Sequence, residues 1–204
     1  LQRSDDAIDW LEDVHDDYPE HKGVQVLRAR ILLEQQKMDS ARDAFAALHK
    51  NFPEDSAILL SLALLEEELG QREQAREHLY QLLASQAHTD EAHFYLGKIA
   101  QEEEDFDTAI EQYAQVNSGR EFLAAHLKAS YLLNETQGID AARSYLNDLR
   151  GDFPQQSSEL VRIEVDLLSA AGQPEDAMVL ISQALSVAPE DLNLLYTRAM
   201  LAER

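Results

Sequence analysis

The chain has 204 residues, no cysteine and a net charge of −22, from 39 acidic and 17 basic side chains. The lack of cysteine excludes disulfides, zinc–thiolate sites and thiol catalysis within this sequence. A surface of that sign repels phosphate backbones and anionic lipid, so we expect no nucleic-acid partner. The sequence contains no apolar run of membrane-spanning length, so we also expect no direct membrane insertion by this stretch.

Residues 1–21 have the pattern of a single amphipathic helix. Ser4 suits the N-cap and acidic residues follow it, as the helix dipole favours. Ala7 lies on the apolar face, and Pro19 ends the helix because proline has no amide donor. The only tryptophan, Trp10, is in this segment, and part of the face around it is expected to be uncovered.

The sequence then predicts five pairs of helices, each joined by a short turn. The expected pairs cover residues 22–55, 56–89, 90–122, 123–157 and 158–191. Gln25, Arg28 and Glu164 depart from the apolar pattern of their helices. In the second pair Ala87 replaces the closing proline, so residues 88–90 are expected to make that turn. Residues 192–204 predict a first helix without a second, which together with residues 1–21 indicates a piece of a longer array.

The helix pairs share one period. The small residue of each second helix recurs at intervals of 34, 34, 34, 33 and 35 residues, at Ala7, Ala41, Ala75, Ala109, Ala142 and Ala177. A bulky apolar residue follows four positions later each time. Gly70, Gly138 and Gly172 lie between paired helices, where a left-handed turn residue is expected. A generic helical bundle has no reason to keep such a period.

The segment from Asp90 to Val116 resembles the tetratricopeptide repeat, a unit of about 34 residues that reads W-x2-L-G-x2-Y, then A-x3-F, then proline. Leu96-Gly97, Ala109 and Tyr113 carry the resemblance, and the two small residues would let paired helices approach closely. The resemblance implies an all-α fold, a right-handed superhelical solenoid of antiparallel helix pairs. It would contain about five full repeats plus half a repeat at each end, forming a single array over residues 1–204.

The resemblance also implies that the first helices line a concave groove that binds a peptide or protein partner. The expected groove residues are apolar or aromatic with a few charges: Val26, Arg30, Leu33, Leu64, Phe94, Lys98, Tyr131, Arg162, Asp166 and Tyr196. Leu60 and Leu127 share this face, and packing against the next helix explains them equally well. One group of the family binds acidic chaperone tails through a clamp of lysine, asparagine and arginine. That clamp is absent, because Val26, Ser61 and Glu91 occupy three of its positions.

We find no catalytic or metal-binding constellation in the sequence. The seven histidines include no pair spaced four apart on a helix, and there is no H-E-x-x-H, phosphate loop or nucleophile elbow. The acidic run at 102–105 lacks the alternating ligands and the glycine of a calcium loop, so a solvated turn is expected. We therefore predict no cofactor, no metal and no enzymatic activity.

A non-catalytic scaffold for protein–protein interaction is the function that remains. The alanine-rich, lysine-poor character is similar to bacterial tetratricopeptide repeat proteins, including arrays in outer-membrane lipoproteins of pseudomonads. Those arrays dock a periplasmic C-terminal processing protease and present cell-wall hydrolases to it. The resemblance thus implies an adaptor that delivers substrates to a protease, in the periplasm or at the outer membrane rather than in the cytoplasm.

Two alternatives remain open. One is a self-association module, in which the half-repeats or the Trp10 face pair two copies, although a monomer or a weak homodimer is our expectation. The other is the regulatory part of an enzyme whose catalytic domain lies outside this sequence.

Overall fold

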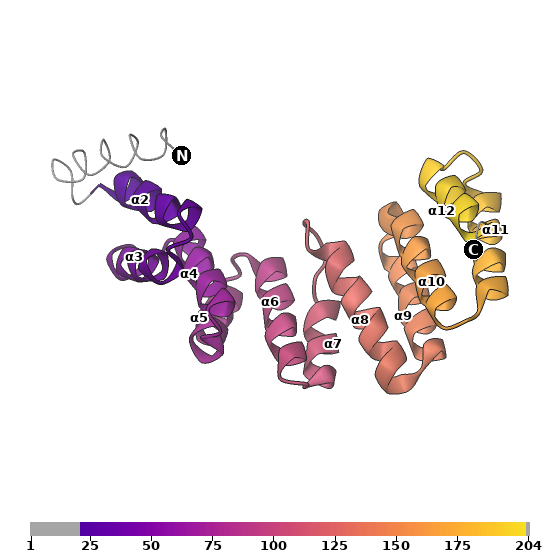
Figure 1. Cartoon of the computed structure of the whole chain (residues 1–204), viewed down its shortest axis with the longest axis horizontal. Coiled ribbons are helices and arrows are strands. Elements are labelled where there is room, and N and C mark those ends of the chain that lie inside the picture. The colour runs from indigo at the N-terminus through magenta and orange to yellow at the C-terminus, as the bar shows by residue number, and fades with distance from the viewer. Residues whose placement is uncertain (1–20, 203–204) are drawn as a thin grey trace. The chain divides into compact units, whose positions relative to one another are not determined.

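A computed structural model describes residues 21–202, which form helices joined by short turns and contain no β-strand (Figure 1). The predicted N-terminal helix with Ser4, Ala7, Trp10 and Pro19 lies outside the described residues. The helices are α2 (Lys22–Glu34), α3 (Met38–Asn51), α4 (Ser56–Glu68), α5 (Arg72–Ala84), α6 (Thr89–Glu102), α7 (Phe106–Ala114), α8 (Phe122–Gln137), α9 (Ile139–Asp152), the 3-10 turn η1 (Pro154–Gln156), α10 (Ser157–Ala170), α11 (Pro174–Val187) and α12 (Leu192–Ala202).

Consecutive helices pair along the chain. Helix α2 packs on α3, α4 on α5, α8 on α9 and α10 on α11, and α12 packs on both α10 and α11. The predicted all-α class of helix pairs is therefore confirmed. The contacts divide the chain into two compact units, residues 1–99 and residues 100–204, with the division inside α6. The single array over the whole chain stays a prediction.

In the first unit, α4 is shared between two apolar clusters. Ile58, Leu62 and Leu65 pack with α2 and α3, whereas Leu59 and Ala63 pack with α5 and α6. This arrangement explains why α4 is apolar on every side, because a helix covered on two faces has little surface left for water. The core therefore passes from one hairpin to the next, as in a repeat protein.

The periodic residues lie in the core. The alanines at 41, 75, 109, 142 and 177 have no exposed surface. The bulky residues that follow them by four positions, Phe45, Leu79, Tyr113, Leu146 and Ile181, are at most 2% exposed. Each second helix thus buries one apolar stripe, in which a small residue leaves room for its neighbours and a large one fills the space beside it.

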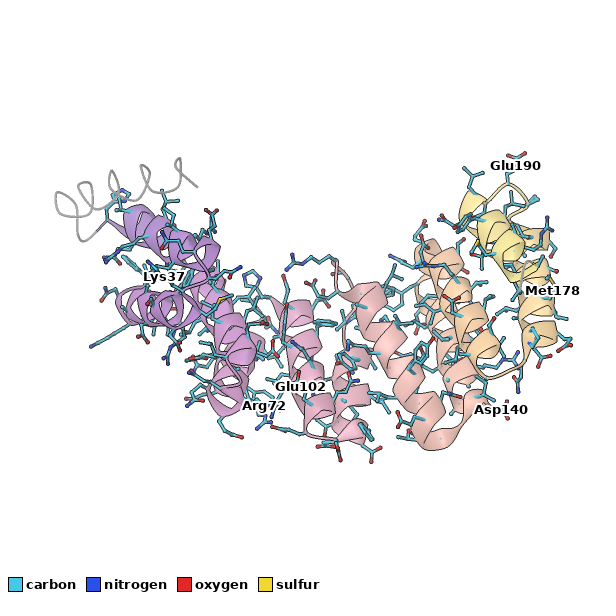
Figure 2. All side chains as sticks on the ribbon, viewed as in Figure 1. Lys37, Arg72, Glu102, Asp140, Met178 and Glu190 are labelled. Atoms are coloured by element: carbon cyan, nitrogen blue, oxygen red, sulfur yellow. The ribbon has the colours of Figure 1, made fainter. Side chains whose placement is uncertain are left out.

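Four of the turns inside the hairpins share one conformation, at positions 34 or 68 residues apart, and the α8–α9 turn at Gly138 differs from them. Gln36, Gly70, Glu104 and Gly172 have φ angles of 59°, 71°, 62° and 73°, which are left-handed. In each turn the next amide bonds to a carbonyl five residues back, as Gln71 does to Glu66 at 2.7 Å. Gln36 and Glu104 are not glycines, yet they adopt the left-handed conformation that the sequence pattern predicts for glycine. Lys37, Arg72 and Glu102 mark three of these turns in Figure 2.

Proline ends three of the second helices in the same way. Phe52, Phe153 and Ala188, each just before a proline, have φ angles of −131°, −123° and −126°. Proline disfavours helical geometry in the residue before it, so the helix stops there. The second pair, where Ala87 replaces proline, ends differently.

Two left-handed residues, Gln86 and His88, make the turn after α5, with φ angles of 55° and 51°. Helix α6 already begins at Thr89, so the expected turn at residues 88–90 is displaced by a few positions. The sequence does not locate this turn, because no glycine or proline marks it.

Candidate partner-binding face

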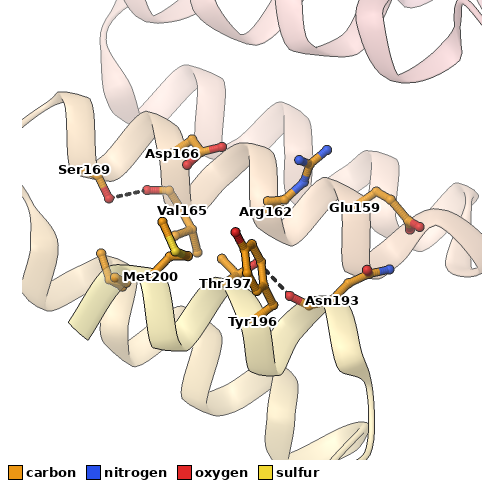
Figure 3. Close-up of a pocket in the computed structure, with 10 residues that line it drawn as sticks. Glu159, Arg162, Val165, Asp166, Ser169, Asn193, Tyr196, Thr197 and Met200 are labelled. Atoms are coloured by element: carbon orange, nitrogen blue, oxygen red, sulfur yellow. Dashed lines mark hydrogen bonds between the residues drawn. The ribbon is translucent and has the colours of Figure 1, made fainter. Parts of the chain in front are cut away.

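Helix α10 lies between two other first helices of the second unit, with α8 on one side and α12 on the other. A cavity of about 550 Å³ lies between α10 and α12 (Figure 3). A second cavity of about 640 Å³ lies between α8 and α10. We call them the α10–α12 cavity and the α8–α10 cavity. Asp166 and Ser169 line both, so the two cavities meet on α10.

Four of the ten predicted groove residues lie in these cavities. Arg162, Asp166 and Tyr196 line the α10–α12 cavity, and Tyr131 lines the α8–α10 cavity together with Asp166. Tyr131 is 40% exposed and Tyr196 is 67% exposed. In Figure 3, Arg162 and Asp166 rise from one side of α10, and Tyr196 stands up from α12 with its hydroxyl directed toward α10.

The predicted groove residues of the first unit lie in different surroundings. Val26 and Leu33 are half-buried against the cluster formed by α2, α3 and α4, so part of each side chain belongs to the core. Leu64 is also half-buried, whereas Arg30 is exposed. Within this unit, therefore, Arg30 presents the most solvent-accessible of these four side chains.

Phe94 and Lys98, both on α6, have partners within the first unit. The Phe94 ring meets Tyr95 edge-on at 5.2 Å between centroids. The Lys98 ammonium lies 2.8 Å from a carboxylate oxygen of Glu67, which is buried on α4. The Lys98 ammonium therefore neutralises a carboxylate of its own chain, and it is less able to form an ion pair with a partner.

Several cavity residues were not among the predicted ones. In the α8–α10 cavity they are Gln101, Lys128, Leu132, Glu135 and Ala170. In the α10–α12 cavity they are Glu159, Val165, Asn193, Thr197, Met200 and Leu201. Ser169 lines both cavities. Glu159, Ser169, Asn193 and Met200 hold the same register positions as the predicted residues. Applying those positions to every repeat would have found them. Leu127, which had two explanations, is 38% exposed and lines the α8–α10 cavity.

A buried ion cluster fixes α10 against α9. The Glu164 carboxylate, 2% exposed, accepts from Arg143 Nε at 3.0 Å and from Arg150 at 2.5 Å. A buried carboxylate is tolerated when charged donors satisfy it, which explains how Glu164 occupies an apolar position. Because Glu164 lies two residues after Arg162, this cluster also orients the helix face that lines the cavities.

A buried histidine joins α8 to its neighbours. His126 Nε2 lies 2.9 Å from the Val116 carbonyl, and Nδ1 bonds to the Tyr145 hydroxyl of α9. The carbonyl can only accept, so Nε2 carries the proton and Nδ1 accepts from the tyrosine. Burial, opposed by the bond to Val116, lowers the pKa of His126 to about 4, and burial also raises the pKa of Tyr145. The imidazole is therefore a neutral structural link.

Within residues 21–202 no cluster of three or more histidine, aspartate or glutamate side chains could hold a metal ion. No described helix has the length and apolar character needed to cross a membrane.

Paired helices with this period define a class of protein. Residues 2–65 match one tetratricopeptide repeat family model and residues 60–120 match another. Together these matches span more than half of the sequence, so the chain belongs to the tetratricopeptide repeat proteins. Proteins of this class are in general non-catalytic scaffolds, so the fold indicates a scaffold for protein–protein interaction with protein or peptide partners.

One protein with a similar sequence comes from Pseudomonas aeruginosa. The chain is 43% identical over 115 residues to TPR repeat-containing protein PA4667 of Pseudomonas aeruginosa. That match covers 56% of this chain but only 20% of the relative, so the chain spans about a fifth of that relative's length.

Solved structures share the fold. The PilF structure of Pseudomonas aeruginosa has a TM-score of 0.63 at 15% identity, over 98% of this chain and 90% of that one. PilW, a type IV pilus biogenesis factor, has a TM-score of 0.61 at 16% identity, over 96% and 90%. YrrB, described as having an unusual peptide-binding site, has a TM-score of 0.56 at 12% identity, over 93% and 97%.

Proposed function

We propose that this chain is a non-catalytic scaffold that binds a polypeptide on the face formed by α8, α10 and α12. The observation that carries the proposal is the pair of cavities that meet at Asp166. Large side chains are exposed beside them, including Tyr131 and Tyr196. Exposed aromatic side chains around a concave surface are typical of protein-binding sites, because they bury much area at little entropic cost.

Within a longer protein, this scaffold would act as an adaptor that presents substrates to a periplasmic processing protease. It would do so as part of an outer-membrane lipoprotein. The similarity to a repeat protein of Pseudomonas aeruginosa supports the bacterial part of this setting. The remaining predicted groove residues, Arg30, Leu64 and Phe94 among them, would contact partners within the first unit.

Site-specific photo-cross-linking tests the binding face. A photoreactive phenylalanine analogue replaces Tyr131 or Tyr196, and an envelope extract of Pseudomonas aeruginosa is the source of partners. The matched control places the same analogue at Val179 on α11, which is 55% exposed and lines neither cavity. We expect adducts from positions 131 and 196 and none from 179, and mass spectrometry should find a protease or its substrates among them.

Two other outcomes of the cross-linking experiment would contradict the proposed binding face. Adducts from position 179 alone would move the binding surface to the second helices. Adducts containing only copies of this chain would support the self-association module instead.

A further inference from the structure

The two cavities share a carboxylate that is open to solvent. Asp166 lines both of them and is exposed. Among the residues that the structure describes, no hydrogen bond or ion pair involves its side chain. A carboxylate at the junction of two cavities is placed to meet a ligand that crosses from one to the other.

The charges around Asp166 favour a cationic ligand. Glu135 adds a second carboxylate to the α8–α10 cavity, and Glu159 adds one to the α10–α12 cavity. Each cavity holds one cation, Lys128 or Arg162. Carboxylates therefore outnumber cations in both, on a chain whose net charge is −22.

One of these cations is directed toward its own chain. Lys128 Nζ lies 3.4 Å from the Gln101 side-chain oxygen and 5.9 Å from the centre of the Tyr113 ring. Arg162 stands one helical turn before Asp166 on α10 and leaves that carboxylate unpaired (Figure 3). The potential at the junction is consequently negative, and it attracts an ammonium or guanidinium group.

Apolar side chains flank the junction on both sides. Leu127 and Tyr131 are 38% and 40% exposed on α8, and Tyr196 and Met200 are 67% and 41% exposed on α12. Each pair is spaced one helical turn apart, so the two side chains share a face. A ligand that spans the cavities therefore meets an apolar surface, then a carboxylate, then a second apolar surface.

We propose that this face selects a peptide segment with a lysine or arginine between apolar or aromatic residues. The cation would sit at Asp166, and the flanking side chains would lie against Tyr131 and Tyr196. This inference rests on the proposed function, because it names the chemistry of the polypeptide bound there.

Fluorescence anisotropy with short labelled peptides tests the proposal. The probes share the sequence Leu-Tyr-X-Leu-Tyr within a Gly-Ser frame, and X is lysine, glutamine or glutamate. For the wild-type chain we expect the lysine peptide to bind about tenfold more tightly than the glutamate peptide, with glutamine between them. Raised salt should reduce this preference, because it screens charges at an open site.

Charge reversal supplies the decisive variant. Asp166→Lys should invert the order, so that the glutamate peptide binds more tightly than the lysine peptide. The matched control is Asp148→Lys on α9, an exposed residue outside both cavities, which changes the net charge equally and should keep the wild-type order. Circular dichroism verifies that both variants keep their helical content.

The outcomes separate this inference from the proposed function. If all three peptides bind equally and Tyr131→Ala weakens them, the binding face stands and its preference for cations is overturned. An unchanged order in Asp166→Lys also overturns it. If no peptide binds with a Kd below about 1 mM, the stated ligand chemistry is wrong. The cross-linking experiment then decides separately whether the face binds polypeptide at all.

Discussion

At the scale of single residues, two buried carboxylates are satisfied by donors of a neighbouring helix. Glu66 on α4 lies 2.6 Å from His78 on α5, and Glu164 on α10 is held by two arginines of α9. Such contacts offset the cost of removing a charged or polar group from water. They also favour one pairing of helices over others, because a shifted helix would leave a buried carboxylate without its donor.

The first prediction concerns His126, which makes stability depend on pH. Its pKa of about 4 in the folded chain is below the ordinary value of 6.5, so between these values the unfolded chain binds more protons. The free energy of unfolding should therefore be fully maintained above about pH 6.5 and fall by about 3 kcal/mol as the pH decreases to about 4. Urea unfolding across this range measures the loss.

Other groups also titrate in this range, so the test compares two proteins. His126→Gln is the control, since an amide can accept from Tyr145 and donate to Val116 but does not titrate. The pKa of Asp55 is lowered chiefly by its bond to Lys22. Asp55 therefore contributes equally in both proteins to the slope of unfolding free energy against pH. Identical pH profiles for the two proteins would contradict the role given to His126.

The sequence identified the hydrophobic stripes but not these polar links. The alanines at 41, 75 and 109 could be predicted because the period repeats them and burial tolerates few alternatives. Glu164 was seen only as a departure from the pattern. Its partners, Arg143 and Arg150, lie about two turns apart on another helix, and nothing local in the sequence links them to Glu164.

At the scale of elements, the turns show how a fold overrides local preference. A left-handed conformation costs a non-glycine residue about 1–2 kcal/mol, yet Gln36 and Glu104 both adopt it. The packing of two long helices supplies more than that cost, so glycine is not required at every repeat. Sequence could therefore predict the turns at Gly70 and Gly172, and at Gln36 it had no signal.

Gly138 is a different case. Its φ of 92° and ψ of 169° belong to a region that essentially only glycine occupies, and it joins α8 directly to α9. Apart from the neighbouring residues of the chain, no atom lies within 4 Å of the position that a Cβ would take, so the backbone conformation and not tertiary packing requires glycine.

The second prediction is that the family's preferred proline destabilises the turn after α5. In Ala87→Pro the ring removes the amide that bonds to the Leu82 carbonyl at 3.0 Å. Proline also conflicts with the left-handed Gln86 before it. We expect a loss of about 1–3 kcal/mol in urea unfolding.

The control for this substitution is Ala87→Ser, which keeps the amide and should cost less. A stabilised Ala87→Pro would mean that the turn can refold into the extended form seen at Phe52 and Phe153. That outcome would show that the present turn is only one of two accessible ways to end α5.

At the scale of the whole molecule, charge and apolar surface act in opposite directions on self-association. Val187 and Leu192, on either side of the turn between α11 and α12, are 86% and 79% exposed and favour contact with another apolar surface. Against this, each copy carries a net charge of −22, so two copies repel each other at low ionic strength. Which effect is larger decides between a binding scaffold and a self-association module.

The third prediction is that repulsion prevails at physiological salt. The screening length is about 8 Å at 0.15 M salt and about 3 Å at 1 M, so salt removes the repulsion and leaves the apolar attraction. Light scattering at micromolar concentration should give the mass of a monomer in the first buffer and at most a weak dimer in the second. The double variant Val187→Lys, Leu192→Lys should abolish any dimer in high salt, because it replaces the exposed apolar side chains with charged ones. A tight dimer that is independent of salt and survives this variant would instead place the self-association surface elsewhere and favour the assembly alternative.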